Sequence, residues 1–389
     1  MNRKKDLRSV LLTAFFVAVS FGAAAAGFAQ AENAPTFDPE VANQLESAVA
    51  SWHKAGLFDG VVLVSQKGKT WTGSAGFAVR EWQIPNSVET RYPIASLTKQ
   101  LTAVLAMRLV ERGRLDLDAS VSSYLKWYPK EIGERISIRD LLSHTSGLPE
   151  MSEGLTFEDL SENGGTRALI LEHFADRPTF EPGTDFAYTN TDDLLLGAVL
   201  SEISGSTFEE LVTGQILEPL GMGSTGIAYR DQVQLRRAHD YVPDGETWLH
   251  APPYRWENWG PAGALYSTVR DLDRWNRALT SHSLLSPETT RLMWTPRTDV
   301  GSTGNYVALG SWVYPRLLPG TERRPVLVER RGAIGGFAAL NVIVRSEKTW
   351  IIILANAYNE QIHQLPWGSS LPFDLLLVLN GLEPEGPGN

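Results

Sequence analysis

Residues 92–100 read Tyr-Pro-Ile-Ala-Ser-Leu-Thr-Lys-Gln and place Ser96 three positions before Lys99. Side chains at positions i and i+3 of a helix share a face, so the hydroxyl and the amine can meet there. A serine hydroxyl is a weak nucleophile until a neighbouring base takes its proton. The pair therefore predicts a nucleophilic serine, provided that the lysine is placed where it can act as a base.

The Ser-x-x-Lys pattern needs its context, because it occurs three times in the chain. Only one copy precedes apolar residues at helical spacing, from Leu97 to Leu109. Burial at the start of that helix would lower the pKa of the lysine and favour a neutral amine. Free N–H groups at a helix start could also hold an oxyanion, whether or not the serine caps the helix. The three copies are Ser51–Lys54, Ser96–Lys99 and Ser123–Lys126, and the first and third are expected to be solvated.

A second motif is the single Tyr-x-Asn of the chain, Tyr188-Thr189-Asn190. It follows a Pro182-Gly183 turn, and loops on a rigid scaffold often carry catalytic groups. Tyr188 could carry a proton between the serine and a leaving group. On this motif alone, a half-buried tyrosine with a local hydrogen-bond partner is the alternative interpretation.

Further blocks give these motifs a family context. With them, the chain resembles the serine β-lactamase and penicillin-binding protein superfamily, in the branch of class C β-lactamases, D-alanyl-D-alanine carboxypeptidases and related esterases. The resemblance covers roughly residues 40 to 380, and ordered blocks are more specific than any one pattern. The added blocks are Leu-Leu-Ser-His-Thr-Ser-Gly-Leu-Pro at 141–149, Ile-Leu-Glu-Pro-Leu-Gly-Met at 216–222 and Pro-Ala-Gly-Ala-Leu-Tyr-Ser-Thr at 261–268.

The resemblance implies a β-lactamase/DD-peptidase-like fold, α/β plus all-α. The sheet would be antiparallel, built from both ends of the chain (about 55–80 and 305–357) and flanked by helices, with a helical lobe inserted between. Strand-like segments at both ends and helical patterns in the middle agree with this expectation. The strand-like segments include 59–66 and 70–78, on the two sides of the Lys67-Gly68-Lys69 turn, and 349–355. Residues 32–382 form the expected hydrolase domain, and residues 383–389 the expected disordered tail.

The resemblance also implies roles for the site residues. Ser96 would be the nucleophile, and Lys99 and Tyr188 together would act as the base. Asn190 would hydrogen-bond the substrate or Lys99.

A third family motif, usually Lys-Thr-Gly or His-x-Gly, is altered here to Arg330-Arg331-Gly332. Arg330 could bind a substrate carboxylate in bidentate fashion but cannot act as a base. By resemblance, Gly332 takes the glycine position, and the N–H groups of Ser96 and Ala333 form the oxyanion hole. A charge on the solvent side of the strand is the alternative for Arg330, because register decides the face.

The implied function is that of a serine hydrolase acting through an acyl-enzyme on an ester, amide or β-lactam carbonyl of a small molecule or peptide. Which of these it hydrolyses stays open, as does the oligomeric state. The alternative is a non-catalytic penicillin-binding or ligand-sensing protein of the same fold. His144 suggests a Ser-His-Asp triad, but it lies within a family block and the chain has no Gly-x-Ser-x-Gly motif, so a structural role is expected.

Composition adds a location and excludes several classes. Basic residues, an apolar run and Ala29-Gln30-Ala31 predict a signal peptide over residues 1–31, and hence a secreted or periplasmic protein without a membrane span after cleavage. Cleavage after residue 31 would remove four basic residues and one acidic residue, so the formal net charge would change from -10 to -13. A protein this acidic is not expected to bind nucleic acid. The chain has no cysteine, and no two histidines have His-x-x-x-His spacing, so we expect neither metal nor cofactor.

Overall fold

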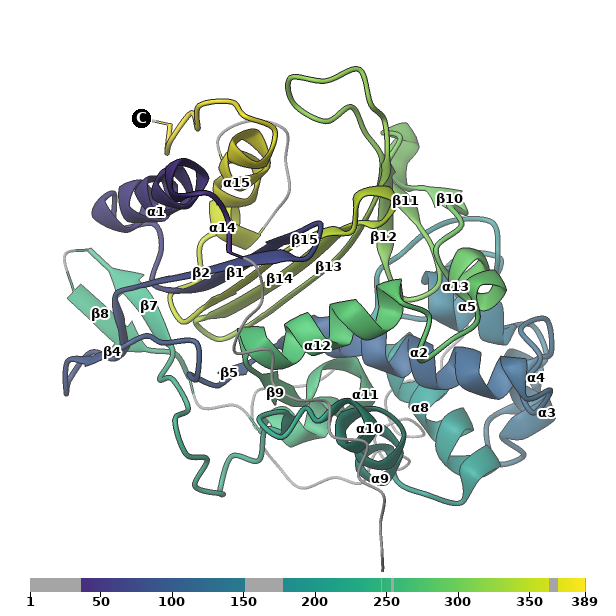
Figure 1. The fold of residues 1–389 in the computed structure, drawn as a ribbon. Coiled ribbons are helices and arrows are strands. Elements are labelled where there is room, and N and C mark those ends of the chain that lie inside the picture. Colours follow the sequence, from purple (N-terminus) through teal and green to yellow (C-terminus); the bar gives the residue numbers. More distant parts are fainter. Residues whose placement is uncertain (1–35, 151–177, 246, 253–254, 364–369, 389) are drawn as a thin grey trace, which may run out of the picture. The chain divides into compact units, whose positions relative to one another are not determined.

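An antiparallel sheet of eight strands joins the two ends of the chain in the computed structural model (Figure 1). The structure describes residues 36–150, 178–245, 247–252, 255–363 and 370–388. The first strand pairs with the last, with Val62 opposite Ile353, which confirms the expected sheet from both termini. In spatial order the strands are β10 (Thr298–Asp299), β11 (Tyr306–Val307), β12 (Trp312–Pro315), β13 (Val326–Ile334), β14 (Phe337–Val344), β15 (Thr349–Ala355), β1 (Gly60–Gln66) and β2 (Lys69–Ala75).

Both faces of the sheet are apolar because helices cover both. One face packs against α1 (Pro39–Lys54) and α15 (Leu371–Leu379), and the other against α2 (Thr98–Glu111) and α12 (Val269–Thr280) (Figure 1). The strands β14 and β15 are accordingly buried along their whole length. Each buried Val, Leu or Ile side chain stabilises such a fold by about 1.5–3 kcal/mol.

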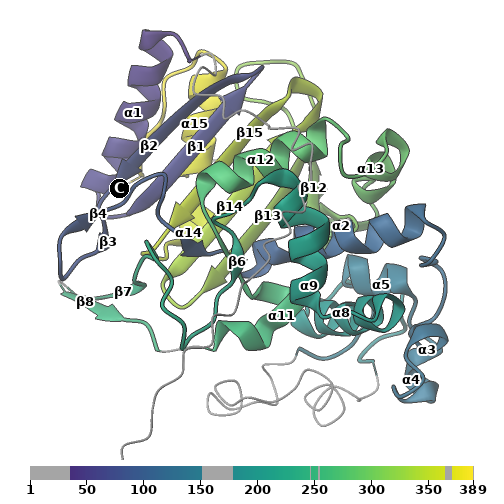
Figure 2. The same cartoon turned by 60° about the horizontal axis from the view of Figure 1, so that its bottom comes forward.

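The inserted helical region lies between β2 and β10 in the chain. Its described helices include α3 (Val121–Tyr124), α4 (Lys130–Gly133), α5 (Ile138–Ser143), α8 (Asn190–Ser204), α9 (Phe208–Val212), α10 (Glu218–Leu220), α11 (Gly260–Gly263) and α13 (Pro287–Met293). Figure 2 shows α5, α8, α9 and α11 gathered beside α2. The long apolar helix expected after Ser96 is α2, and its first turn faces both α8 and α11.

Three small sheets complete the described part. They are β3 (Phe77–Val79) with β4 (Ile84–Pro85); β5 (Tyr92–Pro93), β9 (Leu265–Ser267) and β6 (Gly226–Ile227); and β7 (Tyr241–Asp244) with β8 (Thr247–His250). The β7–β8 hairpin lies beside the β3–β4 segment in both views (Figures 1 and 2).

Two of the expected segments lie at the ends of the chain. The predicted signal peptide lies outside the described residues. The prediction of a disordered tail is wrong for residues 383–388, because the backbone N–H groups of Glu385 and Gly386 donate to Asp374 at 2.8 and 3.1 Å. Composition did not reveal this buried acceptor. Within the described ranges, no helix has the length and apolarity needed to cross a membrane.

Candidate active site

Ser96 lies on a short 3-10 turn, η1 (Ala95–Leu97), directly before α2. The preceding residue, Ala95, has a left-handed backbone with φ of 45°, which costs a residue with a side chain about 1–2 kcal/mol. The surrounding structure holds this conformation: Ile94 N donates to Leu265 O at 2.8 Å, which fixes the entry to the turn on β9. Strain fixed next to a candidate nucleophile is typical of functional sites.

Lys99 is completely buried one turn after Ser96 and is surrounded by acceptors. Its Nζ donates to Ser96 Oγ at 3.1 Å, to Asn190 Oδ1 at 2.6 Å and to Ala262 O at 2.6 Å. Asp193 Oδ2 lies 3.8 Å from the same nitrogen. Asn190 Oδ1 and Ala262 O can only accept from this nitrogen, whereas the Ser96 hydroxyl can either accept from it or donate to it. The contacts therefore fit both an ammonium and the neutral amine expected from the sequence.

Tyr188 approaches Ser96 from the other side. Its hydroxyl donates to Ser96 Oγ at 2.8 Å and accepts from Arg330 Nη2 at 3.3 Å. Partial loss of water around the phenol raises its pKa, but the charges of Lys99 and Arg330 outweigh that effect and bring the pKa of Tyr188 below its ordinary value. The Tyr-x-Asn motif therefore meets the Ser-x-x-Lys motif in space.

Arg330 lies on the site face of β13 and is 1% exposed. Its strand partner Asn341 hydrogen-bonds Gln100 of α2, so the register directs both side chains toward α2. The guanidinium donates through Nε to Ser96 O at 3.0 Å and through Nη2 to Tyr188. Arg330 is therefore not a charge on the solvent side, and two of its donor atoms are committed to the protein itself.

Gly332 allows β13 to touch the serine turn. A Cβ at this position would lie 2.2 Å from Ile94 O and 2.7 Å from Ser96 N, so no side chain fits. Ala333 follows on the same strand and is exposed. This close approach brings the strand that carries Ala333 next to the turn that carries Ser96.

Two acidic residues near the site were missed from the sequence. Glu150 accepts from Asn190 N at 2.7 Å and from Asn190 Nδ2 at 2.9 Å, which orients the amide oxygen toward Lys99. Asp193 comes three residues after Asn190 on α8, and burial raises its pKa to about 6 even though Lys99 and Arg330 lower it. The i,i+3 spacing of Asn190 and Asp193 was a usable signal. No pattern in the sequence points to Glu150.

His144 has the structural role expected for it. Its Nδ1 lies 3.3 Å from Asp192 Oδ2, and its ring centroid is 4.7 Å from that of Tyr188. Burial, with help from Arg330 and Lys99, lowers the pKa of His144 well below its usual value, and burial raises that of Asp192 well above its own. The two groups support the Tyr188 ring from behind.

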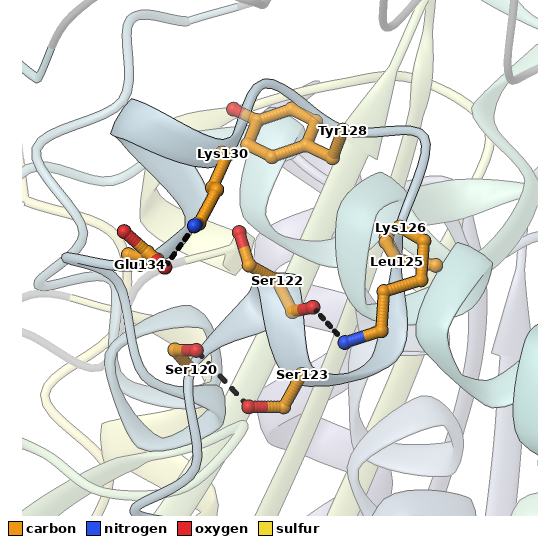
Figure 3. Close-up of a pocket in the computed structure, with 8 residues that line it drawn as sticks. All are labelled: Ser120, Ser122, Ser123, Leu125, Lys126, Tyr128, Lys130 and Glu134. Carbon is orange, nitrogen blue, oxygen red and sulfur yellow. Dashed lines mark hydrogen bonds and ion pairs between the residues drawn. The ribbon is translucent and has the colours of Figure 1, made fainter.

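The other Ser-x-x-Lys copies do not form such a site. Lys126 donates to the backbone oxygen of Ser122 at 2.8 Å, and Ser123 pairs with Ser120 at 3.1 Å (Figure 3). Ser123 and Lys126 line a polar surface pocket between α3 and α4, together with Lys130 and Glu134. Ser51 and Lys54 are exposed on α1.

Comparison with known proteins gives the family. The family model described as Beta-lactamase matches residues 42–366. The chain belongs to the β-lactamase family. The motif blocks and the site geometry of this β-lactamase family member fall within the matched range, which confirms the resemblance inferred from them.

Individual relatives agree with this assignment. The chain is 27% identical over 308 residues to PbpX of Bacillus subtilis (strain 168), named as a penicillin-binding protein, and the match covers 78% of this chain and 71% of PbpX. It spans 60% of the length of Protein flp of Staphylococcus aureus (strain COL), at 24% identity over 78% of this chain. The solved penicillin-binding protein of Bacillus halodurans superposes with a TM-score of 0.71 at 26% identity, over 81% of this chain and 95% of that one. A class C β-lactamase shares the fold, with a TM-score of 0.71 at 22% identity over 90% and 97% of the two chains.

Proposed function

We propose that this β-lactamase family member is an exported serine hydrolase that forms an acyl-enzyme on Ser96. The observation that carries the proposal is that Ser96 Oγ is in contact with both Lys99 Nζ and Tyr188 Oη, at 3.1 and 2.8 Å. A nucleophile flanked by two proton-handling groups is typical of covalent catalysis. Export rests on the signal-like pattern of residues 1–31.

In the proposed first step, Tyr188 takes the Ser96 proton as Oγ attacks a carbonyl carbon. The oxyanion rests on the N–H groups of Ser96 and Ala333, and Tyr188 then gives the proton to the leaving group. Water releases the acyl group by the reverse sequence. A carboxylic ester, an amide and a β-lactam all satisfy this chemistry.

Tyr188 is a better candidate for the base than Lys99. The adjacent charges of Lys99 and Arg330 favour the phenolate form of Tyr188. Lys99 would then stabilise the phenolate and hold Ser96 in place.

The pH dependence tests this assignment. Activity should rise with pH as Tyr188 ionises. The pKa of Asp193 is about 6, so at higher pH this residue is a carboxylate, and its negative charge raises the pKa of Tyr188. The positive charge of Arg330 lowers the pKa of Tyr188. Asp193→Asn should therefore move the rising limb of the kcat/KM profile to lower pH, and Arg330→Gln should move it to higher pH, each by about one unit.

Asp192→Asn is the matched control for this experiment. Asp192 is buried next to Asp193 with its pKa raised well above normal by burial, so the change removes little charge. The rising limb of the kcat/KM profile of Asp192→Asn should stay within about 0.3 pH units of that of the wild type. Tyr188 would be refuted as the ionising base if Asp193→Asn and Arg330→Gln gave identical pH profiles. It would also be refuted if Asp193→Asn moved the rising limb to higher pH and Arg330→Gln moved it to lower pH.

Arg330 provides a test of substrate class. Because its guanidinium is buried and bonded to Ser96 and Tyr188, we expect it to act on the catalytic groups rather than on a substrate carboxylate. At a pH on the rising limb, Arg330→Gln should lower kcat/KM about tenfold for matched esters with and without a free carboxylate alike. A loss confined to the acidic ester would instead show that Arg330 recognises a carboxylate.

The second candidate function is a non-catalytic penicillin-binding or sensing protein, favoured only by the altered third motif, Arg330-Arg331-Gly332. Steady-state hydrolysis of a nitrophenyl ester separates the two. Many turnovers per protein molecule support the hydrolase, whereas acylation that stops at one equivalent supports the sensor.

A further inference from the structure

Three metal-ligating side chains converge away from the candidate active site. They are Glu81, His239 and His250, and one ligand atom of each lies within 4.8 Å of the others. His250 Nε2 is 2.5 Å and His239 Nδ1 is 3.7 Å from the same Oε1 of Glu81. Ligand atoms around a tetrahedral zinc ion are about 3.4 Å apart, given metal–ligand bonds of about 2.0–2.1 Å. Small side-chain rotations would therefore complete a coordination site.

The backbone that carries these ligands is fixed. Asn356, which is fully buried, donates to Phe77 O at 3.0 Å and to His239 O at 2.9 Å. His239 N also donates to Ala78 O at 2.9 Å, so the segment before β7 is tied to β3. His250 lies on β8 directly opposite Tyr241 of β7. Ligands on such elements need little ordering when an ion binds.

Tyr241 orients the carboxylate of Glu81. Its hydroxyl donates to Glu81 Oε2 at 2.6 Å and accepts from Arg80 N at 2.8 Å. That bond occupies Oε2 and leaves Oε1 for the two histidines. Hydrogen bonds of this kind behind the ligands are a regular part of metal sites, where their loss weakens binding.

Arg80, which precedes Glu81 in the chain, has its charge paired within the protein. Arg80 is ion-paired with Asp59, and its guanidinium stacks 3.9 Å from the ring centroid of Trp248. All three ligand side chains are solvent-exposed. A hydrated cation can therefore reach them without crossing a charged barrier.

We propose that Glu81, His239 and His250 bind one late first-row divalent ion, with Zn²⁺ as the best match and water as the fourth ligand. Two imidazoles and a carboxylate suit Zn²⁺ and disfavour Mg²⁺, which prefers oxygen ligands. The ion would clip the β7–β8 hairpin to the segment after β3. This site is independent of acyl transfer, because none of the contacts described for its ligands involves Ser96, Lys99 or Tyr188.

Calorimetric titration of tag-free, metal-stripped protein with ZnCl₂ tests the proposal. We expect one ion per chain and at least about tenfold weaker binding in His239→Ala, His250→Ala and Glu81→Gln. Tyr241→Phe should weaken binding about tenfold while keeping all three ligands. Co²⁺ added to the stripped protein should give the visible absorption of a tetrahedral ion, and MgCl₂ should give no binding heat.

The control is His282→Asn, a histidine outside the cluster whose left-handed backbone, with φ of 61°, asparagine tolerates. It should bind Zn²⁺ as the wild type does, as should Ser96→Ala. The proposal is overturned if no stoichiometric binding occurs, or if His239→Ala and His250→Ala bind as tightly as His282→Asn.

Discussion

Ser96→Ala should lower kcat for a nitrophenyl ester by about 10⁴-fold or more, because the step that forms the covalent bond loses its nucleophile. Residual hydrolysis would come only from the remaining groups that position substrate and stabilise the oxyanion. The substitution removes one oxygen, which Lys99 and Tyr188 contact. The measurement is the initial rate at saturating substrate, with the melting temperature of each protein recorded beside it.

Ser123→Ala is the matched control for that experiment. Ser123 belongs to another Ser-x-x-Lys copy, and its hydroxyl pairs only with Ser120 among its described contacts. Its activity should equal that of the wild type. Turnover by Ser96→Ala within tenfold of the wild type would exclude Ser96 as the nucleophile.

Tyr188→Phe should lower kcat/KM by about 10²–10⁴-fold, the range expected when a general acid–base group is removed. The change keeps the ring that packs against His144 at 4.7 Å and deletes only the hydroxyl that contacts Ser96. KM for a neutral ester should change much less than kcat, because the lost group acts on a proton rather than on bound substrate. A pH–rate profile of the variant should lack the rising limb assigned to Tyr188.

Tyr229→Phe controls for the loss of a tyrosine hydroxyl as such. Its hydroxyl donates to Glu209 Oε2 at 2.5 Å, outside the candidate site, and its activity should match that of the wild type. If Tyr188→Phe keeps at least a third of wild-type activity across the pH range, proton transfer must be assigned to another group, with Lys99 the first alternative.

Much of the fold was readable because its signals are local. The strand-like stretches 59–66 and 70–78 on the two sides of the Lys67-Gly68-Lys69 turn predicted β1 and β2, and the apolar run at 349–355 predicted β15. A sheet assembled from both ends of the chain was expected, but the pairing of β1 with β15 was not, since no local pattern specifies a partner so distant in the chain.

The core of the candidate site was also predicted, because Ser96, Lys99, Tyr188, Asn190 and Arg330 stand in motifs. The residues that were missed act through space. Glu150 reaches Asn190 across 40 positions, and neither residue marks the other in sequence. His239 and His250 were likewise dismissed on spacing along one helix, although the segment before β7 and the end of β8 bring them together with Glu81.

The orientation of Arg330 depended on strand register, which composition does not determine. Both interpretations made from the sequence, a carboxylate-binding side chain and a charge on the solvent side of the strand, placed the guanidinium where a ligand or solvent could reach it. The structure buries the guanidinium against Ser96 O and Tyr188 Oη instead, and this makes it a neighbour of the candidate catalytic groups.

Intact-protein mass spectrometry after rapid quenching tests the central claim most directly. Wild-type protein mixed with an activated ester or a penicillin should gain the mass of one acyl group, and fragmentation should place that group on Ser96. Ser96→Ala should gain none under the same conditions. Turnover without any adduct in the wild type, or an adduct of equal yield in Ser96→Ala, would contradict the acyl-enzyme on Ser96.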